Sequence, residues 1–157
     1  MTIFMWLSAC LISYALGCVN AAYYWIRWLR GVDVRQFGSG NAGARNVGRV
    51  YGATSFIIVL FIDAILGALA VVTGLMTTGT ESLLPAYCAL LAIVGHVFPV
   101  QLNGRGGKGL AKALGALITL IIVQATVSLW LFTPCMLVLL AFTHRNNIRQ
   151  FMHESRG

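Results

Sequence analysis

Residues 95–112 read GHVFPVQLNGRGGKGLAK, and here an apolar stretch gives way to a loop with four glycines and three cations. Long segments with almost no charged residue lie on both sides of this loop. If these segments are membrane helices, Arg105, Lys108 and Lys112 lie at the mouth of the bilayer. The stretch therefore predicts an anion-binding loop, with phosphate as the candidate ligand, on a helical membrane protein.

The composition of the chain excludes an ordinary soluble domain. Its 157 residues are 59% hydrophobic and 10% charged, whereas soluble domains carry about 25% charged residues. We predict an all-α fold, a polytopic integral membrane helical bundle that forms a single domain over residues 1–157. A net charge of +7 would suit nucleic acid only on a soluble basic face, and these cations fall between apolar segments. Anionic substrates and membrane lipid are the expected partners, and nucleic acid is not.

The apolar segments predict about five transmembrane helices. Three spans are expected at residues 1–26, 53–76 and 82–101. Two short crossings are expected between residues 109 and 144, with roughly 16 residues each where about 20 are usual. A re-entrant hairpin or one long kinked crossing are the alternatives for this last segment. Basic residues cluster in the loops at one side, which the positive-inside rule makes cytoplasmic. We expect the N-terminus to lie outside.

The loop at residues 31–52, GVDVRQFGSGNAGARNVGRVYG, is rich in glycine and arginine. Glycine lets backbone N–H groups converge on an anion and arginine adds forked donors, so we predict an anion-binding loop without a hydrophobic core. Residues 38–43 match the dinucleotide pattern GxGxxG, but that pattern needs a preceding strand and a soluble βαβ unit. The second loop is not a nucleotide-hydrolysing P-loop, because Gly109 follows Lys108 where serine or threonine is required.

Few other side chains in the apolar segments suggest chemistry. Asp63 interrupts the second span, so it either serves the function or pairs with a neighbouring helix. The four cysteines lie in apolar stretches without metal-ligand spacing, and we predict buried thiols and neither a metal site nor a cofactor. No general base is evident, because Asp33 is the only carboxylate close to a motif.

Three motifs in order resemble one known family. They are GSGNAGARNVGR at 38–49, GHVFPVQLNGRGGKG at 95–109 and HRNNIR at 144–149, and GVDVR at 31–35 is also similar. Together they resemble the bacterial membrane acyl-phosphate:glycerol-3-phosphate acyltransferases, the PlsY family. The resemblance is good over residues 16–114 and at the terminal motif, and poor between residues 115 and 142.

The resemblance implies an enzyme of phospholipid biosynthesis in the bacterial inner membrane. It would transfer a fatty acyl group from acyl phosphate to the 1-hydroxyl of glycerol 3-phosphate, giving 1-acylglycerol 3-phosphate (lysophosphatidate) and phosphate. It implies Lys108, His144 and Ser39 as catalytic residues. The implied substrate-binding residues are Asn41, Arg49, Gly106, Gly107, Asn147, Asn46 and His96. The backbone of the two glycines would form a nest for phosphate or for the developing oxyanion. Taken singly, many of these polar residues could instead close turns or cap helices.

The chain departs from the family pattern in its charge and in its length. Arg45 and Lys112 stand where the family usually has threonine, and we expect both cations to join the site, where they would tighten phosphate binding or trap product. The family normally has seven spans, so one helical hairpin is expected to be missing. The alternative function is therefore a non-catalytic paralogue that binds anionic lipid or a phosphorylated solute. A small transporter is disfavoured because no internal repeat is found. A homodimer is one expected assembly.

Overall fold

The computed structural model describes residues 2–80, 82–123 and 127–145, and among these it contains helices and no strand. The helices are α1 (Thr2–Cys18), α2 (Ala21–Arg30), α3 (Ala44–Tyr51), α4 (Ala53–Thr78), α5 (Leu84–Val97), α6 (Leu110–Val123) and α7 (Val127–Thr143), with short 3-10 helices η1 (Val34–Gln36) and η2 (Val100–Leu102). The predicted all-α fold is confirmed.

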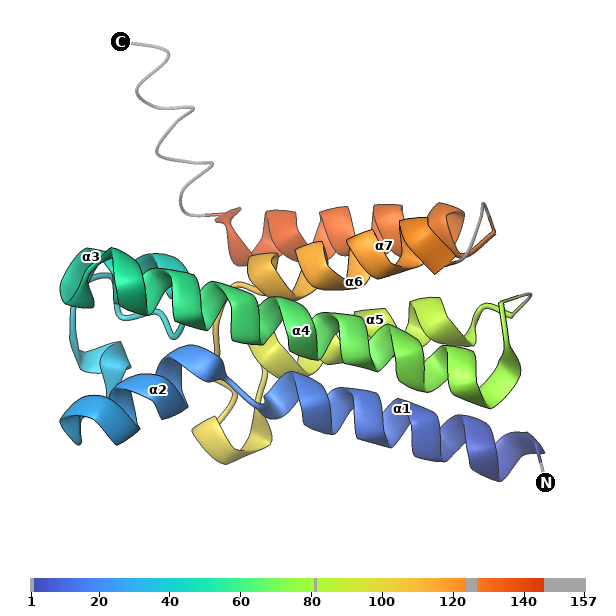
Figure 1. Cartoon of the computed structure of the whole chain (residues 1–157), viewed down its shortest axis with the longest axis horizontal. Helices are drawn as coiled ribbons and strands as arrows, with labels where there is room; N and C mark the ends of the chain where they lie inside the picture. Colours follow the sequence, from blue (N-terminus) through green and yellow to red (C-terminus); the bar gives the residue numbers. More distant parts are fainter. Residues whose placement is uncertain (1, 81, 124–126, 146–157) are drawn as a thin grey trace, which may run out of the picture.

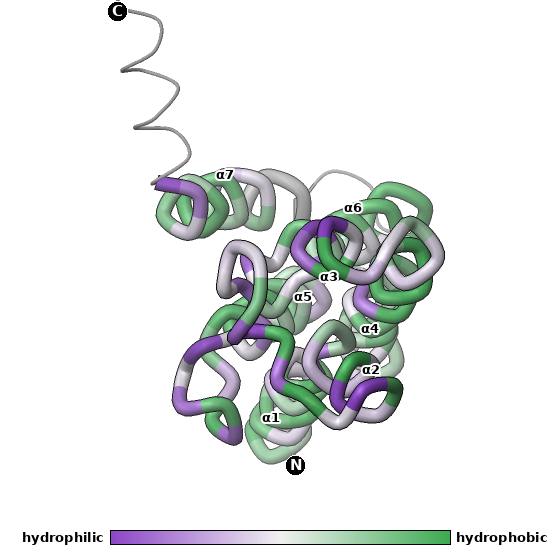
Figure 2. Tube along the Cα trace, turned by 90° about the vertical axis from the view of Figure 1, so that its left-hand side faces the viewer, coloured by the Kyte–Doolittle hydropathy of each residue, from purple (hydrophilic) through white to green (hydrophobic). Residues whose placement is uncertain are grey.

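The long helices lie side by side in one bundle (Figure 1). Helix α4 packs against α1, α5 and α6, while α7 packs on α5 and α6. The N-terminus and the turn between α4 and α5 lie at one end of the bundle, on the right of Figure 1. The loops that follow α2 and α5 and the end of α7 all lie toward the other end. Figure 2 looks onto this second end, where the hydrophilic segments gather. The fold therefore brings the polar motifs together at one pole.

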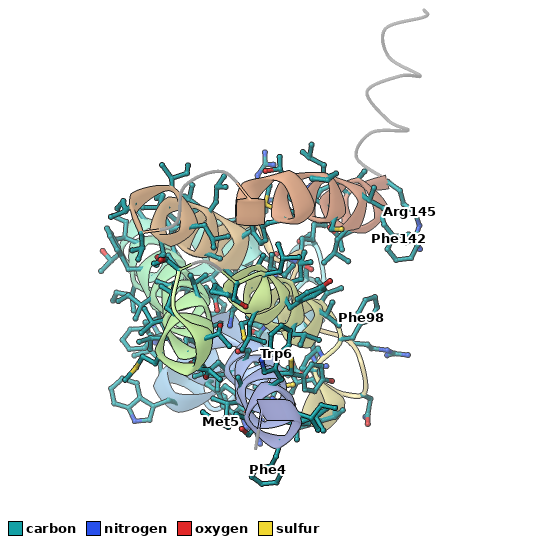
Figure 3. All side chains as sticks on the ribbon, turned by 90° about the vertical axis from the view of Figure 1, so that its right-hand side faces the viewer. Phe4, Met5, Trp6, Phe98, Phe142 and Arg145 are labelled. Carbon is teal, nitrogen blue, oxygen red and sulfur yellow. The ribbon has the colours of Figure 1, made fainter. Side chains whose placement is uncertain are left out.

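Small residues allow the helices to approach closely. A Cβ on Gly17 would collide with the backbone of Ala92, so α1 and α5 meet there without an intervening side chain. A Cβ on Gly115 would likewise collide with the backbone of Ala64, where α6 meets α4. Membrane helices pack through small residues in this way, because lipid provides no hydrophobic force between them. The outer surface is correspondingly apolar, and Phe4 and Phe98 project from it (Figure 3).

Helix length and hydropathy support part of the predicted topology. Two segments are long and apolar enough to cross a membrane, Ala53–Thr78 and Leu84–Leu102, and they match the predicted second and third spans. The predicted first span is not one continuous helix, because the chain bends by 43° between α1 and α2. If that bent pair counts as one span, the described residues contain three. The next two helices, α6 and α7, are shorter, so the fourth and fifth spans remain a prediction.

The segment at residues 31–52 is more ordered than its composition suggested. It contains η1 and α3, and Val34, Ala42 and Val47 are buried against Ile26 of α2 and Val59 of α4. The prediction that no hydrophobic core forms here was wrong. Its glycines instead supply the tight turns, since Gly38 and Gly40 have φ of 61° and 70°, a region that favours glycine.

The prediction of buried thiols holds for only some of the cysteines. Cys18 and Cys88 are buried and Cys10 is partly buried, but Cys135 is exposed on α7. An apolar sequence context predicted burial, yet in a membrane bundle apolar residues also face the lipid.

Candidate functional site

A cavity of about 900 Å³ lies at the polar end of the bundle, between α3, α4, α6, the second glycine-rich loop and the end of α7. Most of the site residues predicted from the sequence line this cavity: Ser39, Asn41, Asn46, Arg49, His96, Lys108 and His144. Gly106 and Gly107 are not among the lining residues. Asn147 lies outside the residues that the structure describes. The three motifs, far apart in the sequence, therefore contribute to one cavity.

The first motif is held in shape by Asn46. Its side-chain oxygen accepts hydrogen bonds from the Ser39 amide (2.8 Å) and the Ser39 hydroxyl (3.1 Å). Its side-chain nitrogen donates to the carbonyl oxygens of Phe37 (3.0 Å) and Val34 (3.3 Å). Asn46 is buried, and both ends of its amide are used inside the loop. It was predicted to bind substrate, and the structure makes it the residue that positions Ser39.

The glycines of the second motif fold back onto α5. The amide of Gly106 donates to the carbonyl of Val97 (3.1 Å), and the amide of Gly107 donates to the carbonyl of His96 (3.0 Å). These two N–H groups are therefore committed within the protein, so the predicted phosphate nest does not form from them. Glycine is needed here for close approach, because a Cβ on Gly107 would collide with the imidazole of His96. The loop presents the Lys108 side chain to the cavity while its backbone is pinned to α5.

Arg35 joins the two glycine-rich segments, a role that the sequence analysis missed. Its guanidinium pairs with Asp33 at 2.7 Å and donates to the carbonyl oxygens of Leu102 (3.0 Å) and Arg105 (3.2 Å). The hydrogen bonds from Arg35 hold the pKa of the Asp33 carboxyl below its usual value. Asp33 is thus an ionised partner of Arg35, which makes it a poor general base. The close spacing in the DVR triplet was the available signal for this pair.

His144 reaches the cavity from the end of α7. The hydroxyl of Thr143 donates to the carbonyl of Lys108 (3.2 Å), which ties α7 to the second loop. The His144 Nε2 atom is buried and has no hydrogen-bond partner among the residues that the structure describes. Burial lowers the pKa of His144, and the positive charges of Lys108 and Arg45 lower it further. At neutral pH the imidazole is therefore neutral and presents an unpaired polar atom.

Lys112 does not join the cavity, contrary to expectation. Its side chain is fully buried, and Nζ donates to the carbonyl oxygens of Leu16 (3.1 Å), Gly17 (3.2 Å) and Val19 (3.0 Å). These carbonyls lie at the break between α1 and α2, where the helical hydrogen bonds are interrupted. The prediction that Lys112 adds a phosphate ligand was wrong, because its ammonium is committed to the α1–α2 break.

Asp63 completes this arrangement from α4. Its Oδ1 atom lies 3.6 Å from Lys112 Nζ and 3.6 Å from His96 Nδ1, and it accepts a hydrogen bond from the Ala21 amide (3.4 Å). Of the two roles left open by the sequence, pairing with a neighbouring helix is therefore observed. Asp63 also lines the cavity, as does His96. Asp63 and His96 thus belong both to the lining of the cavity and to the buried group that contacts the break between α1 and α2.

The cavity is lined by two chemically different kinds of residue. Arg45, Arg49 and Lys108 are cations, and Ser39 and Asn41 add neutral polar groups. Phe56 and Leu60 of α4 and Leu110 and Leu114 of α6 are its apolar lining residues. Such a cavity can hold a molecule with an anionic head and an apolar tail. The apolar bundle and this cavity at its polar end together define the class of helical membrane proteins with an interfacial site suited to anionic, partly apolar ligands.

Comparison with known proteins gives the family. The family model described as glycerol-3-phosphate acyltransferase matches residues 7–143, so this chain belongs to the glycerol-3-phosphate acyltransferase family. The resemblance found in the sequence is thereby confirmed. The chain is 45% identical over 111 residues to the glycerol-3-phosphate acyltransferase of Myxococcus xanthus, covering 71% of this chain and 58% of that relative. It is 43% identical over 117 residues to that of Synechococcus elongatus, covering 70% and 56%. The matches thus span less than two thirds of these relatives.

A solved structure supports the fold. The crystal structure of PlsY (YgiH), an integral membrane glycerol 3-phosphate acyltransferase, in its glycerol 3-phosphate form superimposes with a TM-score of 0.80 at 24% sequence identity. The superposition covers 95% of this chain and 92% of that one. The same protein in its lysophosphatidic acid form gives a TM-score of 0.77. The helical arrangement described above is therefore that of an integral membrane protein.

Proposed function

We propose that this protein transfers a fatty acyl group from an acyl phosphate to the 1-hydroxyl of glycerol 3-phosphate. The products are 1-acylglycerol 3-phosphate and inorganic phosphate. The observation that carries the proposal is a single cavity lined both by the cations Arg49 and Lys108 and by the apolar side chains of Phe56, Leu60 and Leu114. Both substrates carry phosphate, and one also carries an acyl chain. A cavity lined by both kinds of residue suits this pair of substrates.

The proposed reaction is a direct displacement at the acyl carbonyl. The glycerol 3-phosphate hydroxyl oxygen bonds to the carbonyl carbon, and the bond from that carbon to the phosphate oxygen breaks. Phosphate leaves with the electron pair, and one of its oxygens takes the hydroxyl proton. Lys108 stabilises the negative charge that develops on the phosphate and on the carbonyl oxygen, which is strongest in a site that excludes water. Arg49 and Asn41 hold the substrate phosphates in position.

The geometry of Ser39 refines its role in this reaction. Its hydroxyl already donates a hydrogen bond to Asn46 Oδ1, so its oxygen is left to accept one. A phosphate dianion has no proton to donate, whereas the glycerol hydroxyl has one. We therefore assign Ser39 to orienting the attacking hydroxyl. His144, whose Nε2 has no partner within the described part of the chain, is assigned to holding the glycerol 3-phosphate.

The location proposed for the reaction follows from the topology. With five crossings and the N-terminus outside, the cavity opens on the cytoplasmic face of the bacterial inner membrane. Helix α6 has 14 residues and α7 has 17, which gives lengths of about 21 and 26 Å against a hydrocarbon core of about 30 Å. These two crossings require local thinning of the bilayer or packing in a homodimer. Cysteine-accessibility labelling at Gly79 and Gly104, which lie in opposite loops, tests this orientation.

Phosphate release tests the activity. The purified protein in lipid cubic phase is given palmitoyl phosphate, with and without glycerol 3-phosphate. We expect release that depends on glycerol 3-phosphate and falls to background in Lys108→Ala. The matched control is Arg30→Ala, which removes a cation from the end of α2, outside the cavity. Normal transfer by Lys108→Ala would overturn the proposed role of the second loop.

A non-catalytic paralogue is the second candidate. The observation that favours it is that the sequence matches cover only 56–58% of the length of the relatives, although the superposition covers 92% of the solved PlsY chain. If the remainder of those relatives provides part of the acyl groove, this chain binds phosphate but does not turn over. Folded protein that binds glycerol 3-phosphate and releases no phosphate from palmitoyl phosphate would establish this alternative.

A further inference from the structure

Arg45 is placed where a cation is unfavourable for the protein itself. It is the second residue of α3, and the N-terminal end of a helix carries a partial positive charge. Arg49 follows four residues later on the same face of α3, and like charges at this spacing repel each other. Both side chains line the cavity. The positive charge of Arg45 also contributes to the lowered pKa of His144, so these two lining residues lie within electrostatic range of each other.

Among the described residues, no carboxylate pairs with this charge. Of the acidic residues that the structure describes, Asp33 pairs with Arg35 and Asp63 pairs with Lys112. Within the described part of the chain, Arg45 and Arg49 take part in no ion pair. The contrast with Lys112 is informative, because that lysine is fully buried and its ammonium is bound by three carbonyl oxygens and a carboxylate. An uncompensated cluster of cations around a cavity is an arrangement that an anion would stabilise.

We propose that Arg45 is a further phosphate ligand of this cavity and forms, with Arg49, a two-arginine clamp for a phosphate monoester dianion. This inference rests on the proposed function, since it assigns a ligand within the same cavity. Two guanidinium groups one helical turn apart can bind different oxygens of one phosphate with forked hydrogen bonds, which a single cation cannot do. Lys108, on the second loop, remains for the phosphate that leaves. The cavity then holds two phosphate groups at once, as direct transfer between two phosphorylated substrates requires.

Two substrates could supply the clamped phosphate. Glycerol 3-phosphate and acyl phosphate present the same dianionic group, and both arginines lie on α3 beside the apolar residue Phe56. Binding measurements with each substrate class separate the two sources. The probes are glycerol 3-phosphate itself and an acylmethyl phosphonate, in which a CH2 group replaces the scissile oxygen so that no transfer occurs.

The decisive experiment compares Arg45→Thr with the wild type by isothermal titration calorimetry in detergent micelles. Hydrogen bonds to charged groups are worth enough that their loss weakens binding by about 10-fold to 100-fold. We expect this loss for one of the two probes, and the affected probe identifies the source of the phosphate. Arg30→Thr makes the same change outside the cavity, and we expect it to leave both affinities unchanged. Unchanged binding of both probes by Arg45→Thr would overturn the proposal.

A second variant and a second readout keep the result independent of folding and of turnover. Arg45→Lys keeps the charge but loses the planar fork, so we expect an intermediate loss of affinity. Should Arg45→Thr fail to fold, wild-type affinity in Arg45→Lys would overturn the clamp geometry. The His144 pKa, followed by NMR of labelled histidine, should rise in Arg45→Thr and stay unchanged in Arg30→Thr. If wild-type protein shows no transfer but the binding losses appear, the proposed function fails and the clamp stands.

Discussion

Replacing Lys112 by methionine tests the most unusual charge in this protein. Methionine keeps the length of the side chain and removes the ammonium. The substitution leaves the carbonyl oxygens of Leu16, Gly17 and Val19 without their donor and Asp63 without its cation. All of these groups lie between helices, where water cannot replace the lost contacts easily. We expect the bend between α1 and α2 to lose its main support.

The size of the effect follows from burial. Lys112 has an exposed fraction of 0% and Asp63 one of 1%. Removing one partner of a buried pair typically costs about 3–5 kcal/mol, because the other charge stays buried and uncompensated. At about 2–4 °C per kcal/mol for a chain of this size, the melting temperature should fall by roughly 6–20 °C. Adding Asp63→Asn removes the carboxylate charge that Lys112→Met leaves without a cation. The double variant should therefore have a higher melting temperature than Lys112→Met.

Thermal unfolding in detergent, followed by tryptophan fluorescence, measures these shifts. Arg30→Met is the matched control, since it removes an exposed cation from α2, and we expect a change within about 0.5 kcal/mol. The coupling energy of the Asp63 and Lys112 substitutions comes from the double-mutant cycle. A melting temperature for Lys112→Met equal to that of the wild type, or a coupling energy of zero, would refute the reasoning that this pair fixes the bend.

Three further predictions concern the cavity. Asn46→Ala leaves Ser39 and the loop carbonyls without their partner, which should cost about 1–3 kcal/mol of stability. It should also reduce kcat more than it raises KM for glycerol 3-phosphate. An unchanged kcat would contradict the positioning role of Asn46. Gly107→Ala places a methyl group against the His96 imidazole, and overpacking should cost about 1–3 kcal/mol, measured by thermal unfolding. Because the pKa of His144 is lowered in the folded state, the unfolded chain binds the proton first, so stability should fall as pH drops below about 6.5 and level off below the folded pKa. The free energy of unfolding should depend less on pH in His144→Gln than in the wild type. The same pH dependence in both proteins would show that the folded structure does not lower the pKa of His144.

The features that composition controls were predictable from the sequence. The second span was predicted at residues 53–76 and the helix is Ala53–Thr78, because an uninterrupted apolar run has few alternatives to a helix in a membrane. The third span was also found. The break between α1 and α2 at residues 18–21 was not predicted, although Asn20 lies within the apolar run. That break depends on Lys112, more than 90 residues away, and on the Asn20 side chain, which accepts from the Tyr23 amide and starts α2.

The convergence of the motifs was predictable, but the roles of individual residues were less so. Residue types at motif spacing identified Ser39, Lys108 and His144 as neighbours, and all three line one cavity. The same reasoning could not separate residues that face the cavity from residues that build it. Asn46 and Gly107 carry suitable groups, yet their hydrogen bonds are made within the protein. Hydrogen-bond partners depend on tertiary structure, which motif spacing does not encode.

The short C-terminal half bears on the question of activity. Helices α6 and α7 together bring His144 back to the cavity, and the Thr143 hydroxyl holds this end of α7 to Lys108. Placement of His144 at the cavity therefore does not depend on a further hairpin. What a further hairpin would change is the enclosure of the acyl chain, because Leu110 and Leu114 of α6 are exposed as well as lining the cavity. Loss of enclosure would weaken binding of the acyl donor while leaving phosphate binding by Arg49 and Lys108 intact. A comparison of acyl phosphates with short and long acyl chains separates these effects. If lipid encloses the acyl chain in place of a hairpin, the affinity for the donor should still rise with chain length. If nothing encloses the acyl chain, the affinity should be independent of chain length.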